Sequence, residues 1–575
     1  MDGSKASSNW DQQFDVIVVG SGAGGMTAAL CAQGEGLSSV VLEKAEVFGG
    51  TTAVSGGGIW IPCNDDIPKN GGSDSYDEAL TYVKYLTEGE VPVPRIEAYL
   101  QNAPEMVRHL GKKFGVPFRG VKLYPDYYPD KPGGKAGWRS MEPVEFNAAE
   151  LGEEFNRMRP PFAGTLVMGR MSMNQVEAHT LFTKGKGWIG IVVKMLFRYC
   201  LDLGWRFKSK QDRRLTLGQA LVAQLRAALL RNNIPLWLES GMESLIEENG
   251  RVVGVVVKKG GKSLRLQARR GVVLATGGFE NNQAMREQYL PQPTNANWTG
   301  APRINDGDGI RAGLALGAKL GFMNLVWGSP TVHVPGAASQ TTLFVERCAP
   351  GCVIVNKKGQ RFVNEAAAYP DVVTAMYQDD KRGNGSVPAW FIFDGEFRKK
   401  YPAGLFLPSQ IQPDSALPKD WLDKVYYRAD SLEALAAKIG VDAKGLVATA
   451  AKIGEYAKTG KDPEFGKGDT AIDRYYSDPT VTPNPCLGPV AKAPFYAIKL
   501  YPGEIGTKGG LWCDERARVQ REDGSVIPGL YAIGNCSAAV MGKTYAGAGS
   551  TLGPAMTFGY IAARDLARAP QLAAA

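Results

Sequence analysis

Three glycines near the start of the chain, Gly20, Gly22 and Gly25, have the G-x-G-x-x-G spacing of a dinucleotide-binding turn. In such a turn the first glycine permits a tight bend, the second lets the backbone approach a pyrophosphate, and the third lets a helix pack closely on a strand. A helix that begins there presents free N–H groups to the phosphates. These residues therefore indicate that the chain binds a dinucleotide.

The neighbouring residues have the pattern of the elements that must position this turn. Residues 16–19 are an apolar run typical of a buried parallel strand, and residues 26–31 predict a helix. A second apolar strand ends at Glu43, whose carboxylate could accept hydrogen bonds from a ribose. The motif alone is weak in a chain in which 70 of 575 residues are glycine. Strand, turn, helix and acid in this order favour a Rossmann-like fold over a chance glycine turn.

Further clusters of small residues favour a flavin over a nicotinamide. Residues 48–52 and 55–58 are rich in glycine and hydroxyl groups, so the backbone can pass close to a flat ring system. Residues 271–278 and 529–534 each read as a strand that ends in glycine. All four segments resemble those of FAD-dependent flavoproteins of the fumarate reductase type, which bind FAD with residues from both ends of the chain.

The resemblance implies a set of FAD-binding residues, most of them small or hydroxyl-bearing. No histidine lies within residues 48–58 to form a covalent link, so the FAD is expected to be non-covalent. The expected contacts are Gly20, Gly22, Ala23, Gly24, Gly25, Glu43, Lys44, Gly50, Thr51, Thr52, Ser55, Gly56, Gly57, Gly58, Thr276, Gly277, Gly278, Gly534, Asn535, Thr551 and Leu552.

Flavin enzymes that desaturate a carbon next to a carbonyl need donors that polarise the carbonyl and a base for the α-proton. Tyrosine suits an apolar pocket because it combines a hydroxyl with a hydrophobic ring. The chain has 22 tyrosines, and any one of them is by default a half-buried aromatic with a satisfied hydroxyl. A catalytic assignment therefore needs a specific motif around the tyrosine.

Five motifs spread over nearly the whole chain resemble those of the 3-ketosteroid Δ1-dehydrogenases. The resemblance implies an α/β fold in which a Rossmann-like FAD-binding domain carries an inserted α+β catalytic cap domain. The motifs occupy residues 49–62, 124–128 (Tyr-Pro-Asp-Tyr-Tyr), 361–369, 506–510 and 545–549 (Tyr-Ala-Gly-Ala-Gly).

The same resemblance implies roles for four residues. Tyr545 and the backbone N–H of Gly549 would hold the steroid C3 oxygen, Tyr369 would take the proton from C2, and Tyr127 would assist Tyr369. An unperturbed tyrosine has a pKa of ~10, so Tyr369 needs such a partner. The C1 hydrogen would leave as hydride to the flavin, which converts a 4-ene-3-oxosteroid into a 1,4-diene-3-oxosteroid in steroid degradation. A quinone or another carrier would then reoxidise the FAD.

Two positions depart from the family pattern. Some members have Tyr-Pro-Gly-Pro-Gly where this chain has alanines at 546 and 548, a change that affects loop stiffness but keeps Tyr545 and Gly549. Phe362 replaces a tyrosine of some relatives, at a position to which no catalytic role is assigned.

The segment after Gly549 predicts a helix over residues 555–567. Ser550 or Thr551 can cap it, and Pro554 suits its first turn. If its N-terminus faces the flavin, the helix dipole would stabilise negative charge on the reduced ring.

A chain of 575 residues is too long for one core. We expect an FAD-binding domain over residues 10–325 and 497–567, with a catalytic substrate domain over 326–496, because the flavin segments lie on both sides of that stretch. Ligands often bind between such domains.

A segment at about residues 140–215 resembles an insertion of the longer family members. Within it, residues 188–205 are apolar except for Lys194, Arg198 and Asp202, which lie four apart and form one narrow helical stripe. The flanks are basic. An apolar helix with such flanks suits a membrane surface, and a buried helix that covers the FAD domain is the equally weighted alternative. The first interpretation predicts peripheral contact through residues 184–214 with the inner face of the cytoplasmic membrane.

Composition argues against several other classes. The net charge of +8 is mild, and no basic run has interleaved aromatics, so nucleic-acid binding is not expected. Residues 1–13 lack a signal-peptide core, and no uncharged apolar stretch is long enough to span a membrane, so a cytoplasmic location is expected. Eight scattered cysteines are interpreted as reduced thiols, and three histidines, His109, His179 and His333, predict no metal site.

Three alternatives remain beside Δ1-desaturation. A dicarboxylate reductase of the fumarate reductase type needs arginine and histidine anchors, and three scattered histidines argue against it. A 3-ketosteroid Δ4-(5α)-dehydrogenase, which acts on the same ring, is the closer rival. A non-catalytic flavin-binding protein is disfavoured by the intact tyrosine motifs.

Overall fold

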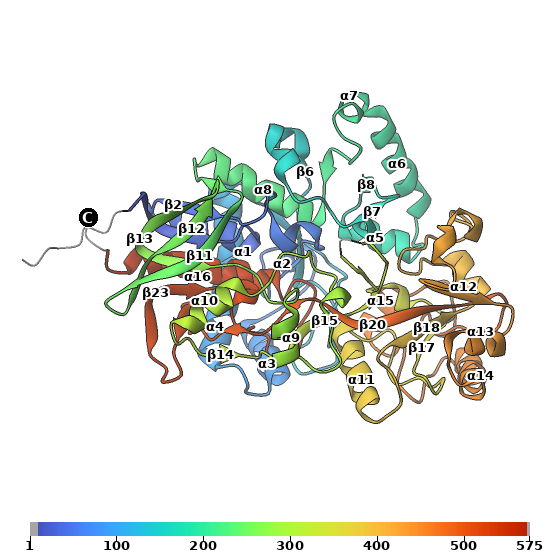
Figure 1. Ribbon diagram of the computed structural model, residues 1–575. Helices are drawn as coiled ribbons and strands as arrows, with labels where there is room; N and C mark the ends of the chain where they lie inside the picture. Colours follow the sequence, from blue (N-terminus) through green and yellow to red (C-terminus); the bar gives the residue numbers. More distant parts are fainter. Residues whose placement is uncertain (1–9, 338, 572–575) are drawn as a thin grey trace, which may run out of the picture.

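The computed structural model describes residues 10–337 and 339–571. Its framework is two β-sheets that lie toward opposite ends of the molecule, each with helices packed on it (Figure 1). The larger sheet contains the strands that precede the glycine-rich segments. The smaller one is built mainly from the stretch between them.

The larger sheet has the strand order β10-β2-β1-β13-β12-β11, and β23 and then β22 attach to β13. Strands β10, β2, β1, β13 and β23 run parallel to one another, whereas β12, β11 and β22 pair antiparallel with their neighbours. Val19 pairs with Leu274, which in turn pairs with Ala532, so these strands end at one edge. The strands are β1 (Gln12–Val19), β2 (Ser39–Leu42), β10 (Leu236–Trp237), β11 (Ser240–Glu248), β12 (Arg251–Lys259), β13 (Lys262–Leu274), β22 (Arg518–Gln520) and β23 (Val526–Ala532).

Helices cover this sheet because its central strands are apolar on both faces. Helix α1 (Ala23–Gly34) packs between α16 (Leu552–Arg568) and α8 (Leu217–Arg231). A Cβ on Gly24 would lie 2.9 Å from the carbonyl oxygen of Ala555, so glycine is required where α1 meets α16. Helices α3 (Tyr76–Thr87) and α4 (Val93–His109) pack on each other, and α4 packs on α16.

Helix α16 begins at Leu552, three residues earlier than expected, with Pro554 in its first turn. The expected side-chain cap is wrong. Thr551 occupies the N-cap position, but its hydroxyl donates to the Tyr545 hydroxyl, and the Ser550 hydroxyl bonds to the backbone of Gly547. Both side chains stabilise the preceding loop instead.

The smaller sheet has the antiparallel order β16-β15-β20-β18-β17, with β19 also paired to β20. Side chains alternate across it: Phe391 and Phe393 pack toward α11, and Trp390 and Ile392 toward α13 and α14. Helix α13 begins directly after Ser431, whose side chain caps it. The elements are β15 (Val326–Val332), β16 (Thr341–Thr342), β17 (Cys352–Val355), α11 (Tyr369–Lys381), β18 (Ala389–Phe393), α12 (Gly395–Lys400), β19 (Tyr426–Ala429), α13 (Leu432–Ile439), α14 (Ala443–Thr459), α15 (Ala471–Tyr475) and β20 (Phe495–Thr507).

Short elements connect the two sheets. A three-stranded sheet in the order β3-β5-β4 carries the loop that contains Tyr127. The short elements are α2 (Asp66–Lys69), β3 (Ile59–Trp60), β4 (Phe118–Gly120), β5 (Ser140–Pro143), β6 (Phe146–Asn147), β7 (Leu166–Val167), β8 (Met171–Ser172), β9 (Arg214–Leu215), α9 (Gln283–Tyr289), α10 (Asp308–Ala315), β14 (Leu320–Gly321) and β21 (Gly510–Leu511).

Helices α6 (Trp188–Leu201) and α7 (Leu203–Arg206) project from the body at the top of Figure 1, and α5 (Gln175–Phe182) packs on α6 below them. Met195 is the one residue of α6 that is buried, and it packs on Met171 and Met173. The alternative of a buried helix covering the FAD domain is therefore wrong. In residues 10–337 and 339–571, we find no helix with both the length and the apolar character needed to cross a membrane.

Candidate active site

Three tyrosines from distant segments meet between the two sheets. The Tyr127 hydroxyl donates to the Tyr369 hydroxyl at 3.1 Å. The ring centroid of Tyr545 lies 5.1 Å from that of Tyr127 and 5.6 Å from that of Tyr369. The structure thus brings together the three tyrosines that the sequence motifs single out. Their neighbour Tyr128 points elsewhere, since its hydroxyl donates to Asp371 at 2.8 Å.

The loop between β4 and β5 fixes Tyr127. Its N–H donates to the carbonyl of Ala546 at 3.0 Å, which joins this loop directly to the loop of Tyr545. The preceding Asp126 is fully buried, and its carboxylate accepts hydrogen bonds from the Arg139 guanidinium at 2.8 Å and from the indole N–H of Trp60 at 2.7 Å. The loop next to Tyr127 is therefore fixed by a buried ion pair.

Gly549 is held in a backbone conformation that favours glycine. Its φ is +100°, and a Cβ there would lie 2.4 Å from the Cα of Ile59. Its N–H makes no hydrogen bond to any residue that the structure describes. The Tyr545 hydroxyl accepts from Thr551 at 3.2 Å, so its own proton can be donated to a ligand. Two donors, a phenol and a backbone amide, are thus available for one ligand oxygen.

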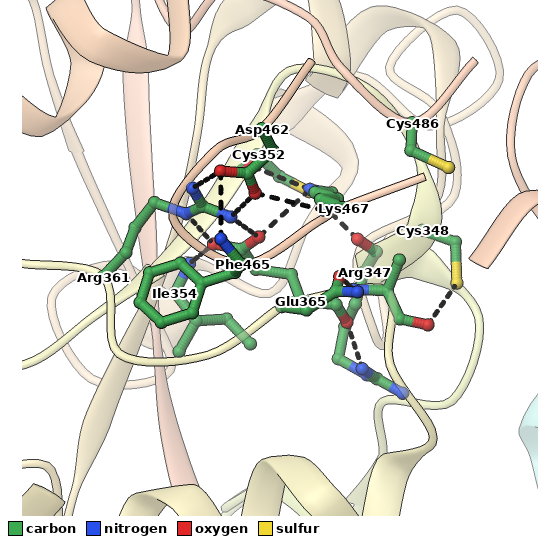
Figure 2. Close-up of polar contacts among 12 residues, drawn as sticks. Arg347, Cys348, Cys352, Ile354, Arg361, Glu365, Asp462, Phe465, Lys467 and Cys486 are labelled. Atoms are coloured by element: carbon green, nitrogen blue, oxygen red, sulfur yellow. Dashed lines mark hydrogen bonds and ion pairs between the residues drawn. The ribbon is translucent and has the colours of Figure 1, made fainter. Parts of the chain in front are cut away.

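Tyr369 is the first residue of α11, and a network of buried ions fixes the segment before it (Figure 2). Arg361 binds Glu365 and Asp462, each at 2.8 Å, and Lys467 lies 3.5 Å from Glu365. All four side chains are almost fully buried. Arg347 donates to the carbonyls of Glu365 and Ala367, directly ahead of Tyr369.

Burial sets the protonation of the cluster. It raises the pKa of Tyr369 well above its usual value, and the hydroxyl of Tyr127 acts in the opposite direction. Burial also raises the pKa values of Tyr127 and Tyr545. All three are therefore phenols at neutral pH.

A buried lysine supports the loop of Tyr545. Lys508 donates to the carbonyls of Gly542 at 3.1 Å and Thr544 at 2.6 Å, and its ammonium lies over the ring of Trp327. Burial lowers the pKa of Lys508 to about 7. The sequence motif at 506–510 thus serves to hold the turn before Tyr545.

The expected cofactor residues gather at the edge where β1, β13 and β23 end. Gly20 has a φ of +113°, and a Cβ there would lie 2.2 Å from the carbonyl oxygen of Ala275. A Cβ on Gly22 would meet only the hydroxyl of Thr52, at 3.6 Å, so this side of the turn is open. A Cβ on Gly50 would be 3.6 Å from Gly22, and Gly534 lies against Ala555. The two ends of the chain therefore form one glycine-lined cradle.

The other expected cofactor residues line or brace this cradle. Ala23 donates its N–H to Thr52, and Thr51 accepts from Asn305. Ser55 donates to the carbonyl of Thr52 and accepts from Gly57. Gly25 packs against Gly20, and Gly56 and Gly58 face Gln175. Thr276 contacts Gly309, Gly277 contacts Asn305, and Gly278 contacts Thr507. Asn535 accepts a hydrogen bond from Trp327, and Leu552 is the first residue of α16.

Two of the expected contacts are engaged within the protein. Glu43 accepts from the hydroxyl of Ser21 and from the N–H of Ala45, so part of its hydrogen-bonding capacity holds the turn. Lys44 forms ion pairs with Asp306 and Asp308, both at 3.0 Å.

Sequence reasoning missed several residues of the cradle. Glu280 is fully buried and burial raises its pKa to about 7, while Asn305 donates to it. Arg159 has two buried nitrogens without partners in the described structure. Arg95 lines a cavity together with Asn535 and Thr551. No spacing rule marks these residues, because they come from segments outside the glycine motifs.

Comparison with known proteins identifies the family. Residues 15–552 match the model of the FAD binding domain family. A 3-oxosteroid 1-dehydrogenase of Comamonas testosteroni is 42% identical over 562 residues, which cover 97% of each chain. The chain belongs to the 3-oxosteroid 1-dehydrogenase family. Its cofactor is FAD, and the expected flavoprotein fold is confirmed.

Two solved structures locate the chain within related folds. The crystal structure of 3-ketosteroid delta1-dehydrogenase from Sterolibacterium denitrificans, in complex with 1,4-androstadiene-3,17-dione, has a TM-score of 0.95 and 53% identity, over 97% of this chain and 100% of that chain. That of 3-ketosteroid-delta4-(5alpha)-dehydrogenase from Rhodococcus jostii RHA1 has a TM-score of 0.66 and 22% identity, over 98% and 99%. The second likeness shows a shared fold alone.

The cradle fits FAD by its own geometry. Gly22 is open toward the space in front of α1, while Gly20 and Gly25 are closed by neighbouring backbone, as a pyrophosphate-binding turn requires. Helix α1 supplies N–H groups at its N-terminus. The residues at the ends of β1, β13 and β23 would thus hold the dinucleotide. The tyrosine cluster lies beside the part of the cradle that comes from the C-terminal segment of the chain, since Thr551 donates to Tyr545.

Proposed function

We propose that the protein desaturates the C1–C2 bond of 3-ketosteroids and converts a 4-ene-3-oxosteroid into a 1,4-diene-3-oxosteroid. One observation carries this proposal: the hydrogen-bonded pair of Tyr127 and Tyr369 lies beside the two free donors of Tyr545 and Gly549. A base and an oxyanion site therefore face the same space. When bound, FAD supplies the acceptor for the hydride that leaves C1.

Each group has one task in this reaction. Tyr545 and the N–H of Gly549 bind the C3 oxygen and stabilise the negative charge that develops there. That charge acidifies the proton on C2, which Tyr369 removes. Tyr127, which donates to Tyr369, stabilises the phenolate and passes the proton on. The ring centroid of Trp327 lies 4.8 Å from that of Tyr545, and the ring centroid of Phe344 lies 4.9 Å from that of Tyr369. These two aromatic side chains exclude water from the tyrosines.

The proposed domains are residues 10–325 and 497–567 for FAD binding and residues 326–496 for the substrate. They follow the two sheets except at β20 (Phe495–Thr507), which crosses this boundary and belongs to the smaller sheet. The contribution of Tyr369 from α11, next to β15, supports this division, because the base then comes from the second domain and the carbonyl donors from the first.

A direct assay tests the activity. The purified protein is incubated with a dye acceptor and either a 4-ene-3-ketosteroid or a 5α-reduced 3-ketosteroid, and the position of the new double bond is identified by mass spectrometry and NMR. A 1,4-diene is expected. A product desaturated only at C4–C5 from a 5α-steroid would instead indicate the Δ4-(5α) alternative.

We also propose that the FAD is held without a covalent bond, because residues 48–58 contain no histidine. Acid precipitation should release the flavin into the supernatant. Yellow colour retained in the precipitated protein would contradict this expectation.

Peripheral membrane contact through residues 184–214 is proposed on the exposed face of α6. Ile189, Val193, Phe197 and Leu201 are all more exposed than buried, and Phe197 is 67% exposed. Phe207, just beyond α7, is 91% exposed. An exposed apolar patch of this kind next to basic residues is attracted to anionic lipid at about 1 kcal/mol for each cation near the surface. The steroid substrates are poorly soluble in water, so an enzyme at the bilayer would meet them where they accumulate.

The double variant Val193→Asp and Phe197→Asp tests this contact, because both side chains face solvent. Ile191 is unsuited to the test, since it packs on the methionines of β8 and α6. Binding to vesicles that contain phosphatidylglycerol is measured at low salt by co-sedimentation. The variant should lose binding while its melting temperature stays unchanged. If the unmodified protein fails to sediment with the vesicles, the contact does not exist.

A further inference from the structure

Seven arginines of the described structure are buried, and six of them bind carboxylates or backbone carbonyl oxygens. Five bind carboxylates, and Arg347 donates to four backbone carbonyls. The five carboxylate-bound residues are Arg139 with Asp74 and Asp126, Arg226 with Glu154, Arg286 with Glu504, Arg361 with Glu365 and Asp462, and Arg398 with Asp414. Arg95 is the exception.

Arg95, in the first turn of α4, is 3% exposed yet lacks a counter-ion. One nitrogen reaches the Ser537 hydroxyl at 3.5 Å, the outer limit of a hydrogen bond, and its Nε has no partner. No carboxylate in the described residues forms an ion pair with it. Its other close neighbour is the ring of Phe558, 5.2 Å away.

The nearest acidic groups do not neutralise Arg95. Asp514 is bound to Arg518 at 2.7 Å. Burial raises the pKa of the Cys513 thiol to about 12, so it is uncharged. Burial also lowers the pKa of Arg95, and Cys513 and Asp514 do not offset this effect. An isolated buried cation is costly, so proteins retain one where an anion completes its environment.

The position of Arg95 indicates which anion this is. It lines a cavity with Asn535, Ser550, Thr551 and Ala555, at the N-terminus of the 17-residue helix α16. The positive end of the helix dipole and the guanidinium therefore act on the same space. That space adjoins the glycine cradle, because Ala555 contacts both Gly24 and Gly534.

We propose that Arg95 and the N-terminus of α16 form the anion site that neutralises negative charge on the bound FAD. FAD offers two such charges: the pyrophosphate, which is always charged, and the isoalloxazine ring, which gains charge on reduction. This inference rests on FAD as the cofactor and is independent of the steroid reaction.

The test uses the FAD-loaded protein, with Arg95→Met and Arg95→Lys, and Arg108→Met at the exposed far end of α4 as the matched control. The readouts are the midpoint potential, the dissociation constant for sulfite, which adds to flavins whose ring anion is stabilised, and the rate of FAD release on dilution. None of these needs a steroid. If the ring is the anion, Arg95→Met should bind sulfite at least about tenfold more weakly and lower the potential by about 30 mV, the equivalent of tenfold for two electrons.

Arg95→Lys should retain an intermediate effect, and it serves as the test if Arg95→Met fails to fold. Faster FAD release with an unchanged potential would identify the pyrophosphate as the anion. Potential, sulfite affinity and FAD release that all match those of Arg108→Met would overturn the proposal. Absence of steroid turnover in the unmodified protein would contradict the proposed function without bearing on this site, because none of the three readouts needs a steroid.

Discussion

The FAD cradle and the tyrosine cluster are adjacent parts of one site, yet they are built in opposite ways. The cradle is made of backbone: glycines at strand ends, left open at Gly22 and closed at Gly20. The cluster is made of side chains from three separate segments, joined by the hydrogen bond between Tyr127 and Tyr369. The cradle therefore depends on local turns, whereas the cluster depends on everything that fixes those three segments.

The electrostatics of the two parts also differ. In the cluster, burial keeps all three tyrosines neutral, and the charge that matters appears only during reaction. Around the cradle, charges are present at rest, in Lys44 with its two aspartates and in the unpaired Arg95. Substitutions in the cluster should therefore affect turnover, and substitutions in the cradle should affect cofactor binding.

The largest expected effect is that of Tyr369→Phe. Loss of the proposed general base should lower kcat by about 10²–10⁴-fold, while the ring keeps its apolar surface for the steroid. Stopped-flow reduction of the flavin measures the rate, and the steroid-induced change in the flavin spectrum measures binding. Tyr128→Phe is the matched control, because its hydroxyl binds Asp371 outside the cluster. Equal turnover in the two variants would remove Tyr369 as the base.

Tyr545→Phe should have a smaller effect, spread over binding and catalysis. One of the two proposed donors to the C3 oxygen is lost while the N–H of Gly549 remains, and loss of one oxyanion donor typically costs about 10²–10³-fold in rate. Steady-state kinetics should show a lower kcat and a higher KM. A reduction below about fivefold in kcat/KM would mean that another group polarises the carbonyl.

Glu365→Gln should lower the free energy of unfolding, because it removes one charge from the buried ion network in the segment before Tyr369. Burial acts to raise the pKa of Glu365, but Arg361 and Lys467 outweigh it and hold that pKa at about 2. The folded pKa is thus depressed, so the carboxylate contributes stability above its unfolded pKa of ~4.3 and loses it as pH falls toward 2. Removing one charge of such a buried network costs about 3–5 kcal/mol.

Denaturant unfolding between pH 6 and pH 2 measures this contribution, because it is lost between the unfolded pKa of ~4.3 and the folded pKa of about 2. The parent protein should lose stability as the pH falls, and Glu365→Gln should start lower and depend less steeply on pH over the same range. Asp462→Asn, which removes the other carboxylate on Arg361, serves as the second variant. Equal pH profiles for parent and variant would show that Glu365 is not the titrating group.

The same contrast explains what could be predicted from sequence. The cradle follows from spacing within one turn, and its strand, helix and glycines fold as expected. The tyrosines were recognisable only through their motifs, since nothing in the spacing of Tyr127, Tyr369 and Tyr545 shows that they meet. The partners of Arg361 and Lys44, about 100 and 260 residues away, were not predictable, because long-range ion pairs leave no local pattern. Arg95 is hidden for the same reason, and Thr551 was misassigned as a cap because its hydroxyl is used by a tertiary contact.

The smallest predicted effect concerns the cradle, where the open glycine Gly22 and the closed glycine Gly20 should respond differently to the same substitution. Gly22→Ala introduces a methyl group in ordinary contact with Thr52 and with a permitted backbone, since the φ of Gly22 is −67°. The fold should therefore be unaffected, but the methyl group occupies the approach to the pyrophosphate, and FAD should bind about tenfold more weakly, or about 1.4 kcal/mol. Gly20→Ala, two residues away, places its methyl 2.2 Å from the carbonyl oxygen of Ala275 at a φ of +113° and should instead prevent folding of the turn. Far-ultraviolet circular dichroism measures folding, and titration with FAD measures the affinity. Unchanged FAD affinity in Gly22→Ala would mean that the pyrophosphate does not pass over this glycine, contrary to what the G-x-G-x-x-G spacing predicts.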